Sequence, residues 1–186
     1  MAKASIWDRY ARGLNNVIKG DRKRRLILTP IAAIIFFGII TFFVFCSFWV
    51  DKGLHLPYLP HVWWRYVIAG IVFTVGLVLA LITVSKFFSI RGTPVPTSPP
   101  PKLITTGLYG CIRNPMALGM LLILEGLGFY FGSLSLIIFF APLPVALYAL
   151  YVKAVEEPEL ELRFGKPYRE YKKKVPMFVP RLRKKL

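Results

Sequence analysis

The chain has 186 residues, of which 55% are hydrophobic and 15% aromatic, yet its formal net charge is +16. A soluble domain of this length could not bury so much apolar side chain in long uninterrupted blocks, whereas a lipid bilayer accepts such blocks. The Lys and Arg residues flank the apolar blocks and are not interleaved with aromatics, which disfavours nucleic acid as a partner. We therefore expect an all-α fold, a polytopic transmembrane helical bundle of about four spans.

The first 25 residues are basic, and their apolar residues recur at helical spacing. This pattern predicts a short amphipathic helix on the membrane surface, with a disordered basic arm as the alternative. The segment lacks the apolar core and small-residue cleavage site of a signal peptide, so we expect it to be retained.

Four apolar blocks follow, over residues 26–50, 62–90, 115–130 and 134–155. The first has no formal charge over a length that can cross a hydrocarbon core of about 30 Å. Between the second and third blocks, residues 91–101 (RGTPVPTSPPP) are too rich in proline for a helix and are expected to form a stiff loop.

Prolines and glycines mark the expected ends and breaks of the last two helices. Pro115 suits the first turn of the third helix. Gly132 and Ser133 suggest a tight turn after it, and Pro142 and Pro144 are expected to kink or divide the fourth helix.

The positive charges set the expected orientation. With four spans, 23 of the 25 Lys and Arg residues lie on the side of the two termini, leaving Lys52 and Arg65 on the other side. The positive-inside rule then places both termini in the cytoplasm, in a membrane of the bacterial plasma-membrane type. We expect one structural domain made of a basic segment (1–25), a transmembrane hairpin with its loop (26–100) and a core with two spans and a basic tail (101–186).

Three residues, Cys46, Cys111 and Glu125, are not expected to take part in a disulfide, a metal site or catalysis in this topology. Cys46 and Cys111 are expected near opposite membrane faces, where they cannot form a disulfide, and no ligand spacing suggests a metal site. Glu125 is the one acidic residue inside an expected span. Its position towards the non-cytoplasmic end favours a structural or headgroup role over a catalytic one.

The segment 105–119 brings unusual residues to the start of a transmembrane helix on the cytoplasmic side. Free N–H groups and the positive dipole end of a helix N-terminus can hold a carboxylate or phosphate. Arg113 would add charge-assisted hydrogen bonds. The alternative is that Arg113 is an ordinary positive-inside anchor.

A second unusual segment lies where the fourth span leaves the membrane. Five of the nine acidic residues lie between 156 and 170, where anionic lipid would repel them. Glu156 and Glu157 therefore favour a cationic partner, either Arg113 or a positively charged ligand. Glu159 and Glu161 fit a solvated helical face, and the lysine run 172–174 is expected to contact anionic headgroups.

These segments together resemble the isoprenylcysteine carboxyl methyltransferase and phospholipid methyltransferase superfamily. Its members show a G-x-Y-x-x-x-R-[HN]-P-x-Y segment and, one hairpin later, E-E-x-x-L-x-x-x-F-G-x-x-Y-x-x-Y-x-x-x-V-P. The matching stretches here are Gly107–Gly119, Glu156-Glu157, Phe164–Tyr171 and Val175-Pro176. The resemblance covers about residues 100 to 180. Asn114 stands where the carboxyl methyltransferases have histidine, and Ala117 replaces the usual tyrosine.

The resemblance implies an integral membrane enzyme that uses S-adenosylmethionine to methylate a lipophilic acceptor, either a prenylcysteine-type carboxylate or a phospholipid amine. Arg113, Glu156 and Glu157 would be catalytic, with Arg113 orienting an anionic acceptor and a glutamate serving as base for an amine. The residues that would line the cofactor site are Tyr109, Asn114, Pro115, Met116, Leu118, Gly119, Glu156, Glu157, Tyr168 and Tyr171.

Two other functions remain open from the sequence. Membrane sterol-type reductases have a related C-terminal fold and bind a nicotinamide cofactor there. A non-enzymatic membrane subunit that binds lipid is the other alternative, which Ala117 and the short N-terminal half support.

Overall fold

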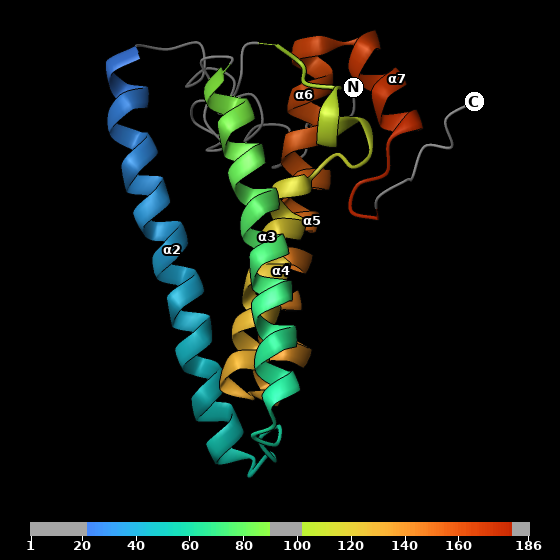
Figure 1. The fold of residues 1–186 in the computed structure, drawn as a ribbon. Helices are drawn as coiled ribbons and strands as arrows, with labels where there is room; N and C mark the ends of the chain where they lie inside the picture. The colour runs from blue at the N-terminus through green and yellow to red at the C-terminus, as the bar shows by residue number, and fades with distance from the viewer. Residues whose placement is uncertain (1–21, 90–101, 180–186) are drawn as a thin grey trace, which may run out of the picture. The chain divides into compact units, whose positions relative to one another are not determined.

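The structure is a computed structural model that describes residues 22–89 and 102–179, and every regular element in these ranges is a helix (Figure 1). The all-α prediction is therefore confirmed. The chain divides into two compact units. The first unit consists of Met1–Ala33, Thr83–Pro115 and Ala149–Leu186, and the second of Ile34–Ile82 and Met116–Tyr148. Most of the expected amphipathic segment, the proline-rich loop and the end of the basic tail lie outside the described residues.

The first two apolar blocks form the helices α2 (Arg22–Gly53) and α3 (Trp63–Ser89). Their long apolar runs are helical because a helix satisfies its own backbone polar groups, which lipid cannot do. Pro30 lies inside α2, where its ring removes one backbone donor. These bounds agree with the predicted spans 26–50 and 62–90.

The third apolar block forms α4 (Pro115–Phe131), which begins at the predicted proline. Gly132 ends the helix in the left-handed region, with φ of 73°, which costs glycine little because it has no Cβ. The backbone N–H groups of Gly132 and Ser133 both donate to the carbonyl of Gly128, at 2.8 and 3.1 Å. The tight turn expected here is confirmed.

The fourth apolar block is divided, as its prolines predict. A π-helical segment (Leu136–Phe140) precedes α5 (Pro142–Tyr151), and a second π-helical segment (Val152–Glu156) precedes α6 (Glu157–Phe164). The Ala141 N–H donates to the Leu136 carbonyl at 2.8 Å, five residues back. This wider turn accommodates Pro142, which has no N–H to continue the regular pattern.

The last helix, α7 (Lys166–Lys174), follows α6 after a single residue. That residue is Gly165, whose φ of 63° lets the chain change direction between the two helices. α7 is polar except for one face, which buries Tyr168 and Tyr171.

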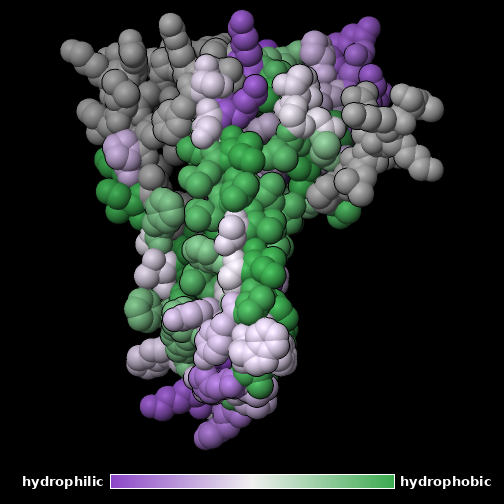
Figure 2. All heavy atoms as spheres, viewed as in Figure 1, coloured by the Kyte–Doolittle hydropathy of each residue, from purple (hydrophilic) through white to green (hydrophobic). Residues whose placement is uncertain are grey.

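Two helical stretches are long and apolar enough to cross a membrane: Trp63–Phe87, and Leu136–Phe164 when its π-helical and α-helical segments are taken together. α4 is a shorter apolar helix, and α2 is also compatible with the expected count of four spans. Figure 2 shows apolar side chains over the visible face of the second unit's helices and hydrophilic ones at the loop after α2. Ile34, Trp49 and Trp63 are 72%, 81% and 77% exposed. Such apolar exposure suits lipid rather than water.

Inside the second unit, α3 and α4 approach each other through glycines. A Cβ on Gly76 would lie 2.7 Å from the Gly119 carbonyl oxygen and 2.7 Å from the Ile123 nitrogen. Near the other end of α4, a Cβ on Gly126 would lie 2.8 Å from the Phe73 backbone. The two backbones therefore pack as closely as small residues allow in membrane helices.

A buried polar cluster joins the end of α2 to the turn after α4, also within the second unit. The Asp51 carboxylate accepts the Ser135 N–H at 3.0 Å and the Ser133 hydroxyl, while the Ser135 hydroxyl donates to the Ser47 carbonyl at 2.8 Å. All four residues are at most 2% exposed. Each buried polar group thus has a partner, and the turn is fixed to α2.

Candidate active site

The loop before α4 is held by the segment that follows α7, within the first unit. The backbone N–H of Arg113 donates to the Pro176 carbonyl at 2.9 Å, and that of Asn114 donates to the Met177 carbonyl at 3.1 Å. The Arg113 Nε also donates to the Val175 carbonyl at 2.9 Å. Residues about 60 positions apart in the sequence therefore fix the side chain of Arg113.

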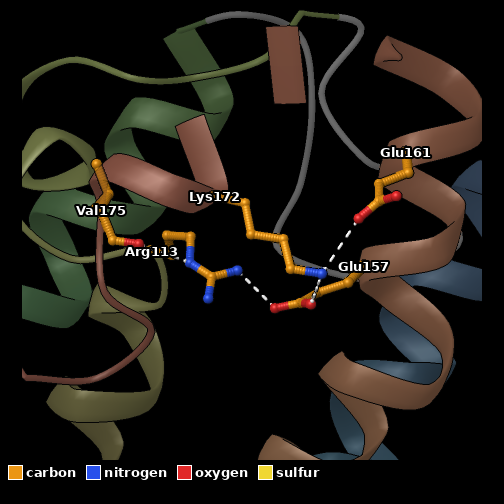
Figure 3. A network of polar contacts seen from close by, with 5 residues as sticks. All are labelled: Arg113, Glu157, Glu161, Lys172 and Val175. Atoms are coloured by element: carbon orange, nitrogen blue, oxygen red, sulfur yellow. Dashed lines mark hydrogen bonds and ion pairs between the residues drawn. The ribbon is translucent and has the colours of Figure 1, made fainter. Parts of the chain in front are cut away.

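Arg113 and Lys172 share the carboxylate of Glu157 (Figure 3). The Arg113 Nη1 and the Lys172 Nζ each lie 2.5 Å from a different oxygen of this carboxylate. Lys172 also reaches Glu161, with Nζ 3.2 Å from Oε1. We call these four residues the ion-pair cluster. It joins the loop before α4, the start of α6 and α7.

The ion-pair cluster balances its own charge, because its two cations face two carboxylates. The Glu157 side chain is 6% exposed and that of Arg113 is 12% exposed. The hydrogen bond from Lys172 to Glu157 raises the pKa of Lys172 above its usual value, so the lysine stays charged at neutral pH. Glu157 is thus engaged by two protein cations, one of which is the predicted partner Arg113.

An aromatic cluster packs beside these charges. Tyr168, Tyr171 and Val175 are buried, and Leu103, Leu160 and Phe164 pack against them. The Tyr171 hydroxyl donates to the Tyr109 carbonyl at 2.7 Å, which ties α7 to the loop before α4. Burial raises the pKa of Tyr168 to about 12, and it also raises the pKa of Tyr171. These hydroxyls therefore stay neutral at physiological pH and are poor bases.

A cavity of about 90 Å³ lies in the first unit, and six of the residues predicted from the sequence line it. These six are Tyr109, Arg113, Asn114, Glu156, Tyr168 and Tyr171. Lys102 and Phe87 also contribute, and the Phe87 ring packs edge-to-face on the Tyr109 ring with centroids 5.9 Å apart. The cavity thus combines aromatic walls with one carboxylate and two cationic side chains. A polar molecule that carries both charges could be held here.

The other predicted residues are not among those that line the cavity. Pro115 is fully buried at the start of α4. Met116, Leu118 and Gly119 lie in the first turns of α4 and belong to the second unit. Gly119 meets α3 there, because a Cβ on it would lie 2.9 Å from the Gly76 carbonyl oxygen. Glu157 contributes to the ion-pair cluster rather than to the wall.

Lys172 lies elsewhere than the sequence predicts. The lysine run is expected to contact lipid headgroups, but Lys172 pairs with Glu157 and Glu161. A signal was present in the sequence. Tyr168, Tyr171, Lys172 and Val175 recur at i, i+3, i+4 and i+7, which is the spacing of one helix face.

A comparison with protein families identifies the class of membrane protein to which these helices and this site belong. A family profile described as phospholipid methyltransferase matches residues 64–167, more than half of the chain. The chain therefore belongs to the phospholipid methyltransferase family, within the superfamily that its motifs resemble. No curated protein and no solved structure matches the chain. The matched range contains the Arg113 loop and both Glu156 and Glu157.

Proposed function

We propose that this protein transfers a methyl group from S-adenosylmethionine to a lipophilic acceptor at the cytoplasmic membrane interface. The observation that carries the proposal is the cavity in which Glu156, Arg113 and aromatic rings meet, in a chain of a methyltransferase family. S-adenosylmethionine, when bound, supplies an electrophilic methyl group on a sulfonium.

The chemistry of the wall fits this cofactor. Glu156 is a partner for the cofactor's ammonium or ribose hydroxyls, and Lys102 or Arg113 for its carboxylate. The faces of Tyr109 and Phe87 suit a nearby cation. Ligand pockets commonly hold about 300–1,000 Å³, so the cavity of about 90 Å³ holds only part of the molecule, and the rest extends beyond it.

The protein's own task in the reaction is alignment and exclusion of water. Methyl transfer is an in-line displacement, so a nucleophile held behind the methyl group in a dry site reacts fastest. A carboxylate acceptor needs no base, because it is ionised at neutral pH. An amine acceptor must lose a proton, and Glu156 is then the candidate base because the neighbouring tyrosines stay neutral.

Two other functions compete with methyl transfer. A nicotinamide-dependent reductase would use Lys102 and Arg113 for the dinucleotide phosphates, but Glu156 would repel them. A non-enzymatic lipid-binding subunit would need no cofactor at all. The three functions differ in which soluble ligand the protein binds.

Calorimetric titration of the detergent-solubilised protein with S-adenosylhomocysteine and with NADPH separates them. We expect S-adenosylhomocysteine to bind and NADPH not to bind. Glu156→Gln should weaken the binding by about tenfold or more, because it removes a charged hydrogen-bond partner. Glu161→Gln is the matched control. It also removes one carboxylate charge, but from a position on α6 that does not line the cavity, and it should leave the affinity within about twofold.

Absence of S-adenosylhomocysteine binding would refute the proposal, and binding of NADPH instead would favour the reductase. The acceptor needs a separate experiment. Membranes are incubated with radiolabelled S-adenosylmethionine, and the labelled lipid is identified. Mild base releases the label as methanol from a methyl ester but not from an N-methylated headgroup, so the two products can be distinguished.

A further inference from the structure

A second hollow, of about 350 Å³, shares Arg113 with the cavity described above and no other lining residue. Its wall consists of Arg113, Lys172, Lys173, Lys174, Val175, Pro176 and Val179, all within the first unit. We call it the basic groove. It combines four cationic side chains with an apolar strip, and the proposed methyl transfer uses only Arg113 among them.

The charges of the basic groove do not cancel. Arg113 and Lys172 are balanced by Glu157 and Glu161 in the ion-pair cluster (Figure 3). Lys173 and Lys174 are exposed, and neither has an ion-pair partner among residues 22–89 and 102–179. The groove therefore carries two uncompensated positive charges.

Three backbone carbonyls in the segment beside the groove already accept hydrogen bonds from the protein. The carbonyl of Val175 accepts from the Arg113 Nε, and the carbonyls of Pro176 and Met177 accept from the backbone N–H groups of Arg113 and Asn114. Pro176 itself has no N–H. Cationic donors on one side and hydrogen-bonded carbonyls on the other favour an anion over a cation.

Lysines at the end of a helix also complement its dipole, so charge alone does not define a ligand. The apolar strip adds a second requirement. Val179 is 76% exposed although it is aliphatic, and it lies beside Pro176 on the groove wall. A free phosphate would gain nothing from this strip, whereas a phosphate ester with an apolar body would cover it.

The position in the chain favours a lipid. α7 begins two residues after Phe164, where a helical stretch long enough to cross the membrane ends. A nine-residue helix is about 14 Å long, so the groove is within reach of the headgroup layer. We propose that the basic groove binds the phosphate of an anionic membrane phospholipid, held by Lys173 and Lys174, with its glycerol and first acyl carbons against Pro176 and Val179. This lipid is a bound partner and not the methyl acceptor, so the inference does not rest on the proposed function.

The test titrates the full-length protein in a neutral detergent with dihexanoyl phosphatidylglycerol, a short anionic lipid, below its micellar concentration. A paired variant, Lys173→Gln with Lys174→Gln, should bind it about 30-fold more weakly, because each lysine near an anionic surface contributes about fivefold to the affinity. The matched control is Lys166→Gln with Arg169→Gln. It removes the same two charges from exposed positions of α7 outside the groove and should weaken binding less than threefold.

Equal weakening of lipid binding in both paired variants would mean a general effect of net charge and would overturn the proposed lipid site. No weakening in the lysine variant would overturn it too.

Inorganic phosphate is titrated in parallel. If it binds as tightly as the lipid, a free phosphate is the ligand and the lipid assignment is wrong. S-adenosylhomocysteine affinity and the thermal unfolding midpoint are measured on the same samples. Both should be unchanged in the lysine variant, which separates loss of the groove from loss of the fold or of the cofactor site.

Discussion

Glu157 holds two cations with one carboxylate, so its removal has a large expected effect on the fold. Arg113 and Lys172 each lie 2.5 Å from one of its oxygens, and the Glu157 side chain is 6% exposed. Glu157→Gln would leave a largely buried guanidinium without its counter-charge, which we expect to lower the free energy of unfolding by about 3 kcal/mol. Thermal unfolding of the detergent-solubilised protein measures the change.

Glu161→Gln is the comparison for that variant. Glu161 contacts Lys172 at 3.2 Å, but both side chains are about one-third exposed, and such pairs contribute roughly 0.5 kcal/mol. Equal destabilisation by the two substitutions would show that the ion-pair cluster is not centred on Glu157.

The buried tyrosines predict a loss of stability in alkali. Burial raises the pKa of Tyr168 from 10.0 to about 12, so between these pH values the unfolded chain releases a proton that the folded protein keeps. The free energy of unfolding must therefore fall as the pH rises from about 10 to 12. The raised pKa of Lys172 acts in the same direction, because its ion pairs are lost above that pKa.

Tyr168→Phe removes one of these groups without emptying the aromatic cluster. We expect the variant to lose less stability than the wild type between pH 10 and 12, by up to about 2–3 kcal/mol at the upper end. Chemical unfolding at a series of pH values measures this. Parallel curves for the two proteins would rule out a contribution from Tyr168.

At this scale the sequence predicted residue types better than residue roles. The predicted pairing of Arg113 with the Glu156–Glu157 segment is present, because opposite charges at a membrane boundary have few other partners. The sequence did not show which glutamate faces the cavity, since that depends on the wide turn over Val152–Glu156. The sequence also grouped Lys172 with its two neighbours. In a run of three lysines, composition alone does not show which one faces the rest of the protein.

At the scale of helices, the approach of α3 to α4 depends on Gly76. An added Cβ would lie 2.7 Å from backbone atoms of Gly119 and Ile123, and backbone cannot move aside as a flexible side chain can. Gly76→Ala should therefore lower the free energy of unfolding by about 1–3 kcal/mol, the usual cost of overpacking. Thermal unfolding in detergent is again the measurement.

Gly70→Ala lies on the same helix, where a Cβ would meet nothing within 4 Å. It should be neutral or slightly stabilising, because alanine has the higher helix propensity. If Gly70→Ala were as harmful as Gly76→Ala, the cause would be α3 itself and not its contact with α4.

The helices were the most predictable part of the fold. Long charge-free runs fix α2 and α3, Pro115 fixes the start of α4, and Gly132 fixes its end. The division of the fourth block was predicted from Pro142, but the two π-helical segments were not. Neither was the polar cluster around Asp51, since hydrogen bonds between distant serines and an aspartate leave no periodic trace in the sequence.

For the whole molecule, the charge distribution makes the strongest argument about placement. Of the 25 Lys and Arg residues, only Lys52 and Arg65 would lie on the non-cytoplasmic side of a four-span protein. Arg65 is 1% exposed and donates to the Leu59 carbonyl and the Tyr66 hydroxyl, so its charge is engaged within the second unit. Lys52 is then the one cation at that face that counts against the orientation expected from the positive-inside rule.

Accessibility to a charged reagent tests this orientation directly. In a background where Cys46→Ser and Cys111→Ser remove the native thiols, Tyr58→Cys and Arg169→Cys each place one thiol at an exposed position. A membrane-impermeant maleimide should label Tyr58→Cys in intact cells and Arg169→Cys only after permeabilisation. Labelling of Arg169→Cys in intact cells would invert the topology. It would place the cavity on the side opposite the cytosolic pool of S-adenosylmethionine, and methyl transfer as proposed would then have no supply of cofactor.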